Sequence, residues 1–250
     1  MGKTRKNVVV VGGSRDFAGA PFLAAITALR AGAESVVVMA PGRVAWTINA
    51  LSPDLITKKL PGDYLASSHR AAILSQLRTA DLLVVGNGAG TRPATVTLMR
   101  SLMRWPGRKV VDADALKALR GGRVANAILT PNGREWDLLS RANDVTSLIA
   151  RGNVIIRKGP VTEILSRGRT TRMPKTKPGL DKAGMGDVLA GLCAGIWVGA
   201  PDESPAAAAR AALKLGARTA EVLSRKKRGF VFLASDLAAE VRKVRRNRAA

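Results

Sequence analysis

The segment with the clearest chemical potential is a glycine-rich run at residues 177–191, KPGLDKAGMGDVLAG. Glycines let a backbone approach a ligand closely. A helix that begins near Asp187 would point free N–H groups and the positive end of its dipole at an anion, such as a transferring phosphoryl group. At that position Asp187 would stay ionised and take a proton from a hydroxyl nucleophile. A glycine-rich helix start with Asp187 as a simple cap explains the pattern equally well.

The segment TPNGRE at residues 130–135 places an amide and a carboxylate three residues apart, at Asn132 and Glu135. We expect a strand to end and a helix to begin here. Such a pair can organise a hydrated Mg²⁺ ion near phosphates. The same pair can form a capping box, with Asn132 as the N-cap and Glu135 reaching back to it. From these residues alone the capping interpretation is favoured.

Two more polar clusters follow expected strands. Lys158 can meet a phosphate as a point charge and Thr162 can add a hydroxyl, although one Lys-Gly pair is weak evidence in a chain with 41 Lys and Arg residues. Asp112 and Asp114 close another strand, and positions i and i+2 share a face in an extended chain. Both carboxylates could therefore serve one site, and a solvated strand end explains the pair equally well.

Short apolar strands alternate with helices along the chain. This alternation predicts a mostly parallel sheet that is covered by helices on both faces. Ligands bind beyond the carboxyl ends of the strands in such sheets, and the glycine loops at residues 12–13 and 86–90 are expected at that edge. Segment 166–182 is expected to be a loop or hairpin. The expected strands are 8–11, 36–39, 82–85, 109–111, 127–129, 154–156 and 162–165, and the expected helices are 18–31, about 93–105, 187–197, 205–223 and 235–246.

The 250 residues include 41 Lys and Arg but only 18 Asp and Glu, which gives a net charge of +23. This charge favours anionic partners: nucleotides, nucleic acid or acidic membranes. Cys193 is the only cysteine, which excludes an intramolecular disulfide and a cysteine-rich zinc site. His69, the only histidine, is expected at the surface near a helix start. No apolar run approaches the ~20 residues of a membrane span, so we expect a cytoplasmic protein without a membrane partner.

Six segments, taken in their order, resemble the ADP/ATP-dependent NAD(P)H-hydrate dehydratase family of the ribokinase-like superfamily. The resemblance runs from Val8 to about Leu237. It implies an α/β fold, a ribokinase-like three-layer α/β/α arrangement with a mostly parallel central sheet. It also implies one ribokinase-like domain over residues 1–250, with a basic C-terminal helix end or tail at about 239–250. The matching segments are GGSRDFAGAP from residue 12, GNGAG at 86–90 (GPGLG in the family), VDADAL at 111–116, LTPNGREWDLL from residue 129, IRKGPVT at 156–162 and GLDKAGMGDVLAGL from residue 179.

The resemblance implies a role for each matching position. Asp187 would be the catalytic acid–base residue that contacts the substrate. The resemblance also implies an anion hole formed by the amides of Gly184, Met185 and Gly186. The nucleotide phosphate would be held by Lys158, Gly159, Pro160, Val161, Thr162 and Gly186. The pyridine-nucleotide site would be lined by Ala20, Gly88 and Asn132, with Asp112 and Asp114 as nearby support, and Glu135 would contact Mg²⁺ through water.

Three positions depart from the family pattern. Phe17 stands where the family has Tyr, and Met185 stands where it has Thr, so two hydroxyls are lost. Asn132 replaces the His of the family's TPH segment and is similar to the N-x-x-E segment of the superfamily's kinases. These changes leave the phosphoryl-transfer groups in place and bear on the acceptor substrate.

The implied reaction restores NADH or NADPH from its hydrate, with Mg²⁺ and with ADP or ATP as the phosphoryl donor. It releases AMP or ADP together with phosphate. One alternative is a kinase of the same fold that phosphorylates the alcohol of a sugar, vitamin or thiazole, and Asn132 slightly favours it.

A nucleic-acid-binding protein on this fold is the third hypothesis. It would use the net charge of +23 and the basic cluster at residues 225–228. Against it, aromatic residues, which form stacking platforms for single strands, make up only 4% of the chain. Members of the family are often oligomers, so we expect a homo-oligomer that binds small-molecule nucleotides, with nucleic acid as a further partner through non-specific charge.

Overall fold

The valines of the first strand alternate between two hydrophobic cores: Val8 and Val10 face one, and Val9 and Val11 face the other. A strand that is buried on both faces is apolar at every position, which explains this run of four valines. The structure, a computed structural model, describes residues 6–119, 121, 123–174 and 177–246.

Within these residues, a nine-stranded sheet has the order β3-β2-β1-β4-β5-β6-β7-β8-β9. Neighbouring strands from β3 to β7 are parallel, and β8 and β9 complete the sheet as an antiparallel hairpin. The predicted mostly parallel sheet is therefore confirmed. The strands are β1 (Asn7–Val11), β2 (Ser35–Pro41), β3 (Ile56–Leu60), β4 (Leu82–Val85), β5 (Arg108–Val111), β6 (Ala127–Leu129), β7 (Val154–Arg157), β8 (Glu163–Ser166) and β9 (Arg169–Arg172).

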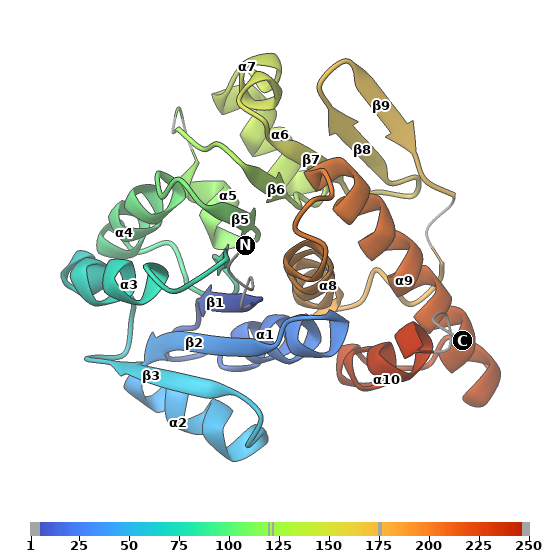
Figure 1. The fold of residues 1–250 in the computed structure, drawn as a ribbon, viewed down its shortest axis with the longest axis horizontal. Helices are drawn as coiled ribbons and strands as arrows, with labels where there is room; N and C mark the ends of the chain where they lie inside the picture. Colours follow the sequence, from blue (N-terminus) through green and yellow to red (C-terminus); the bar gives the residue numbers. More distant parts are fainter. Residues whose placement is uncertain (1–5, 120, 122, 175–176, 247–250) are drawn as a thin grey trace.

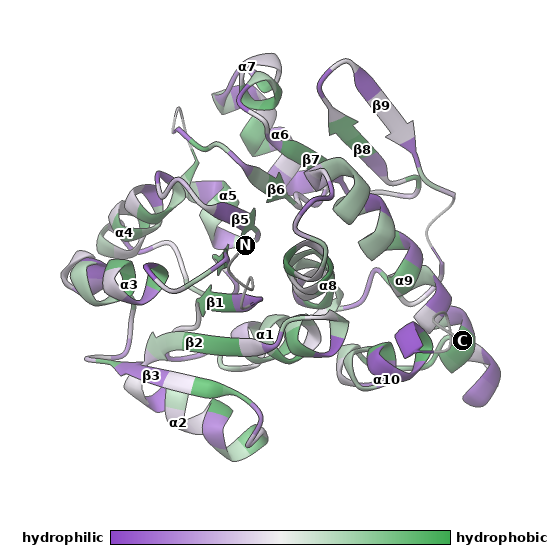
Figure 2. Ribbon diagram, viewed as in Figure 1, coloured by the Kyte–Doolittle hydropathy of each residue, from purple (hydrophilic) through white to green (hydrophobic). Residues whose placement is uncertain are grey.

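Helices cover both faces of this sheet (Figure 1). Helices α1, α2, α8, α9 and α10 contribute to the core that contains Val8, and α3 to α7 contribute to the core that contains Val9. Figure 2 shows β1, β2 and α8 coloured largely as hydrophobic, as expected for elements inside the molecule. The helices are α1 (Gly19–Ala31), α2 (Gly42–Leu51), α3 (Arg70–Leu77), α4 (Pro93–Met103), α5 (Asp114–Ala118), α6 (Gly133–Ala142), α7 (Val145–Ala150), α8 (Met185–Gly199), α9 (Pro205–Lys226) and α10 (Ala234–Arg246).

Several short elements were not among those expected from sequence, namely α2, β3, α3, α5 and α7. Strand β3 lies at the edge of the sheet and exposes Lys58 and Lys59, a composition that protects an edge but hides the strand pattern.

The expected surface position of His69 is wrong: its side chain is buried, and its Nδ1 accepts a hydrogen bond from the N–H of Ala66 (3.1 Å). The imidazole therefore closes the turn before α3.

The C-terminal helix is confirmed, and it ends in the basic residues Lys243, Arg245 and Arg246. Residues 247–250, the last part of the predicted basic tail, lie outside the described residues. Among the described residues, no helix is long and apolar enough to cross a membrane.

Helix α8 is held in place by very close packing against α1. A Cβ atom added to Gly191 would lie 2.4 Å from the carbonyl oxygen of Ala24, and one added to Gly195 would lie 2.3 Å from that of Ala28. Only glycine allows the two backbones this approach. This contact sets the position of the helix that carries Asp187 at its first turn.

We predict that Gly191→Ala lowers the free energy of unfolding by about 1–3 kcal/mol, because the added methyl must push α1 and α8 apart. The matched control is Gly199→Ala on the same helix, where the nearest atom to an added Cβ is 3.5 Å away. Urea denaturation followed by circular dichroism measures both. Equal stabilities of the two variants would show that the close approach does not constrain the helix.

Candidate active site

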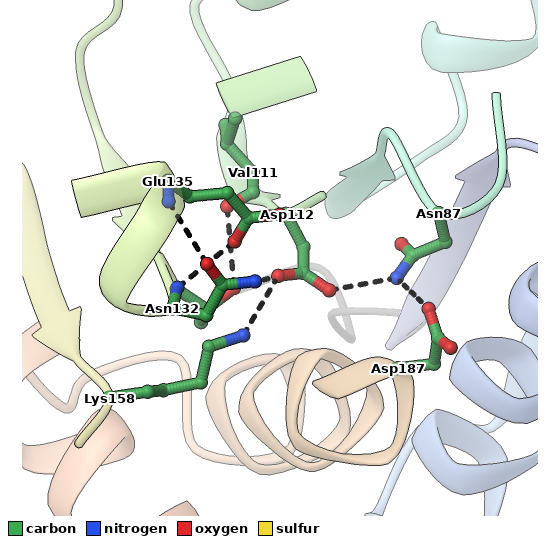
Figure 3. Close-up of polar contacts among 8 residues, drawn as sticks. Asn87, Val111, Asp112, Asn132, Glu135, Lys158 and Asp187 are labelled. Carbon is green, nitrogen blue, oxygen red and sulfur yellow. Dashed lines mark hydrogen bonds and ion pairs between the residues drawn. The ribbon is translucent and has the colours of Figure 1, made fainter. Parts of the chain in front are cut away.

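Polar side chains meet at the carboxyl edge of the sheet, the edge at which the sequence predicted a ligand site. Asn87 follows β4, Asp112 follows β5, Thr130 follows β6 and Lys158 follows β7. These strands are parallel neighbours, so their carboxyl ends lie side by side. The first turn of α8 brings Asp187 to the same place, as Figure 3 shows.

One amide joins the two central carboxylates (Figure 3). The Nδ2 of Asn87 donates to Oδ1 of Asp187 (2.7 Å) and to Oδ2 of Asp112 (3.0 Å). The other oxygen of Asp112 accepts a hydrogen bond from the Thr130 hydroxyl (2.6 Å) and lies 3.5 Å from the ammonium of Lys158. Asn87 and Thr130 were not among the functional residues predicted from the sequence. Their signals were their places directly after apolar strands and within two of the six matching segments.

Asp187 is a partly buried acid beside another acid. Burial, and after it the charge of Asp112, raise the pKa of Asp187 to about 7, while the Asn87 hydrogen bond and Lys158 oppose the shift. The helix start therefore keeps Asp187 ionised only above about pH 7, because desolvation outweighs the charged and hydrogen-bonding groups that favour the carboxylate. An acid with a pKa near neutrality is well suited to accept and return a proton.

The raised pKa has a consequence for stability that can be measured. Ionising Asp187 is less favourable in the folded chain than in the unfolded chain, where an Asp has a pKa near ~3.9. Stability from this group is therefore complete below about pH 4 and is lost as the pH rises through about 7. We predict that Asp187→Asn matches the parent at pH 4 and is more stable by about 2–4 kcal/mol at pH 8.

Chemical denaturation at a series of pH values measures this difference. The exposed Asp202→Asn on the α8–α9 connection makes the same change of charge and is the control. A stability difference for Asp187→Asn that does not change with pH would contradict the assignment of a raised pKa.

The N-terminus of α8 presents backbone donors to the site. Its N-cap is Gly184, whose φ of +81° is a conformation that favours glycine. The N–H of Met185 donates to the carbonyl of Lys182 (3.2 Å), so this predicted anion-hole amide is already bonded. The N–H groups of Gly186 and Asp187 lie in the first turn and have no acceptor among the described residues.

A cavity of about 1200 Å³ opens beside this helix start, large enough for a nucleotide. Gly186 connects the cavity to the acid cluster, since an added Cβ there would lie 3.4 Å from the Lys158 ammonium and 4.0 Å from Asp112. Val161 is exposed and lies next to the lining residue Thr162 in the chain. Predicted nucleotide and anion-hole residues in the lining are Lys158, Gly159, Pro160, Thr162, Met185 and Gly186, and further cations in it are Lys177, Lys182 and Arg218.

Asn132 and Glu135 form the capping box that the sequence favoured. The side-chain oxygen of Asn132 accepts from the N–H of Glu135 (2.9 Å), and the Glu135 carboxylate accepts from the N–H of Asn132 (3.0 Å). Asn132 also lines the cavity, whereas Glu135 is buried and its pKa is raised by that burial. No group of three or more His, Cys, Asp or Glu among the described residues could hold a metal ion.

Asp112 and Asp114 do not share a face as they would in an extended chain. Ala113 has a φ of +50°, and α5 begins at Asp114, so the chain is not extended here. Asp114 instead accepts a hydrogen bond from the N–H of Gly90 (2.8 Å) and pairs with Lys117 (2.7 Å). Its carboxylate therefore supports the loop that follows β4.

Ala20 and Gly88 lie together at a second part of the site. A Cβ added to Gly88 would meet the Cβ of Phe17 at 2.8 Å and that of Ala20 at 3.1 Å. The hydroxyl of Ser14 donates to the carbonyl of Gly88 (2.8 Å) and ties the loops after β1 and β4 together. Phe17 is 59% exposed and presents its ring to solvent at this point.

Comparisons with known proteins agree with this geometry. A family model described as NAD(P)H-hydrate dehydratase matches residues 8–243. The bifunctional NAD(P)H-hydrate repair enzyme Nnr of Pyrobaculum aerophilum is 36% identical over 220 residues, covering 82% of this chain and 44% of that protein. The chain thus spans less than half the length of this curated relative.

Solved structures share the fold. A ribokinase-like superfamily protein from Enterococcus faecalis has a TM-score of 0.81 at 19% identity, over 98% of this chain and 89% of that one. The ADP/ATP-dependent NAD(P)H-hydrate dehydratase of Bacillus subtilis, co-crystallised with ATP and Mg²⁺, has a TM-score of 0.78 at 21% identity, over 98% and 91%. The predicted ribokinase-like fold is therefore confirmed.

Proposed function

Because this chain belongs to the NAD(P)H-hydrate dehydratase family, we propose that it uses ADP or ATP to dehydrate hydrated NADH or NADPH. The observation that carries the proposal is the position of Asp187. This acid, whose pKa is raised to about 7, lies at the start of α8 next to a cavity that is lined by cations. The family match favours this reaction over that of a small-molecule kinase.

Asp187 would begin the reaction by taking the proton of the substrate's ring hydroxyl. The hydroxyl oxygen then forms a bond to the terminal phosphorus of the nucleotide, and the bond from that phosphorus to the leaving AMP or ADP breaks. The phosphate next leaves the ring carbon, pushed by the electron pair of the ring nitrogen, and loss of a proton from the neighbouring ring carbon to water forms the ring double bond of NADH or NADPH. The products are NADH or NADPH, inorganic phosphate and AMP or ADP.

The surroundings of Asp187 support the phosphoryl-transfer step. Lys158 would neutralise charge on the phosphates, and the free N–H groups of Gly186 and Asp187 would stabilise the charge that develops on the transferring group. Bound Mg²⁺ would supply further charge neutralisation. Without a cluster of protein ligands among the described residues, we expect the ion to be held by the phosphates and by water, with Glu135 as an outer contact.

Restoration of NADH tests the proposed function directly. The protein is incubated with NADH hydrate, Mg²⁺ and either ADP or ATP, and the near-ultraviolet absorbance of NADH is followed. We predict that the parent restores NADH and releases inorganic phosphate with at least one of the two donors, and that Asp187→Asn loses nearly all turnover but still binds nucleotide. A stable phosphoester product would instead identify a kinase, and an active Asp187→Asn would remove Asp187 from the role of base.

We predict that Lys158→Met raises the KM for the nucleotide donor by about 10- to 100-fold, because a charge-assisted contact to phosphate is lost. Lys59→Met on β3 is the control: Lys59 stacks on the ring of Trp46 at 4.2 Å and does not line the cavity. Steady-state kinetics at saturating hydrate measures both. An unchanged KM for Lys158→Met would place the phosphates elsewhere.

Four further expectations belong to the same proposal. NAD(P)H and ADP or ATP are cytoplasmic pools, so we propose that the protein acts in the cytoplasm. We also propose that residues 1–250 act as one ribokinase-like domain and assemble as a homo-oligomer. Nucleic acid would bind through the net charge of +23 alone, so that affinity should fall steeply with salt.

A further inference from the structure

Asn87 has side-chain contacts that differ from those of a purely structural asparagine. Its side chain is fully buried, and both recorded bonds of its Nδ2 go to carboxylates, those of Asp112 and Asp187. Its Oδ1 is buried and has no hydrogen-bond partner among the described residues.

Asn153 provides the comparison within the same chain. It is also buried, but its Oδ1 accepts from the N–H of Ala127 (3.0 Å), and its Nδ2 donates to the carbonyls of Val124 and Leu148 (2.8 Å each). All of its partners are backbone groups, and none of its polar atoms is unpaired. The Asn153 side chain therefore binds only backbone groups of the fold, whereas the Asn87 side chain binds two carboxylates.

Chemistry fixes the orientation of the Asn87 amide. With the amide turned over, its carbonyl would face two carboxylates and neither could donate when ionised. The observed orientation satisfies both acids and leaves the buried carbonyl unpaired, which is unfavourable. The amide is thus held by the carboxylates.

We propose that Asn87 is a positioning residue of the dehydration, which holds Asp187 at a fixed place between Asp112 and the substrate. The inference rests on the proposed function. By binding Oδ1 of Asp187, the amide leaves Oδ2 for the substrate hydroxyl. By lying between the two carboxylates, it also keeps them from meeting and sharing one proton.

The groups that act on Asp187 come from four elements. Asp112 follows β5, Glu135 lies on α6 and Lys158 follows β7; both acids disfavour the ionised form of Asp187, and Lys158 favours it. Asn87, which follows β4, favours the ionised form through its hydrogen bond. Removing the amide leaves Lys158 as the only one of these groups that opposes protonation of Asp187.

Two variants test the role of the amide. Asn87→Ala removes both bonds, and we expect the acidic limb of the kcat–pH profile to move up by about one to two pH units. At pH 7 kcat should fall about 5- to 50-fold and recover at higher pH, while the KM for the nucleotide stays within about twofold. Asn87→Asp has the same shape, so it tests the role even if the alanine variant does not fold. The additional carboxylate should raise the pKa of Asp187, and with it the acidic limb of the kcat–pH profile, further than Asn87→Ala does.

Asn153→Ala is the matched control for loss of a buried amide. It should lower stability and leave the pH profile of kcat like that of the parent. If both Asn87 variants also keep the parent's profile and lose only active fraction, Asn87 has a structural role and the proposal is wrong.

A second measurement separates this inference from the proposed function. The carboxyl carbon of Asp187 is titrated by ¹³C NMR in the parent and in both Asn87 variants, with Asp187→Asn for assignment. A midpoint raised in the variants supports the positioning role, and an unmoved midpoint overturns it, whether or not the parent restores NADH. Failure of the parent to restore NADH would overturn only the proposed function.

Discussion

Asp112 and Asp187 lie on either side of one amide, in a place that is largely closed to water. Two acids this close repel each other when ionised, and burial disfavours the charge of Asp187. Asp112 is bonded on both oxygens, by Thr130 and Asn87, and lies near Lys158. Asp187 has one recorded bond and a pKa raised to about 7. A pKa near neutrality suits Asp187 to proton transfer at neutral pH.

The fold positions the carboxylates of Asp112 and Asp187 from several elements. The groups around them come from the ends of β4, β5, β6 and β7 and from the start of α8. A parallel sheet places these ends at one edge. Helix α8 can reach them because Gly191 and Gly195 let it pack directly on the backbone of α1. The site is therefore supported by packed secondary structure, which keeps catalytic groups in place better than a loop does.

The distribution of charge suits a reaction that brings polyphosphate to an acid. The cavity next to α8 has Lys158, Lys177, Lys182 and Arg218 in its lining, and the chain as a whole carries a net charge of +23. Such a field raises the local concentration of nucleotide. Lys158 faces both the cavity and Asp112, so the cation that meets the phosphates also offsets the charge behind them.

The local sequence determined those features that depend on neighbouring residues. Runs such as residues 8–11 and 82–85 must be buried strands because they are apolar at every position. The spacing of Asn132 and Glu135 favoured a capping box, which forms because both partners lie within one helical turn. The ordered motifs also identified the family, because they cover nearly the whole chain.

Tertiary structure decided what depends on distant residues. Asn87 and Asp187 are 100 positions apart, so no local pattern predicts their hydrogen bond. Asp112 and Asp114 do not share a face because Ala113 takes a positive φ, which spacing alone does not predict. The pKa of Asp187 also depends on distant residues: the sequence shows a helix start, which favours the charge, and only the packed structure shows the desolvation that opposes it.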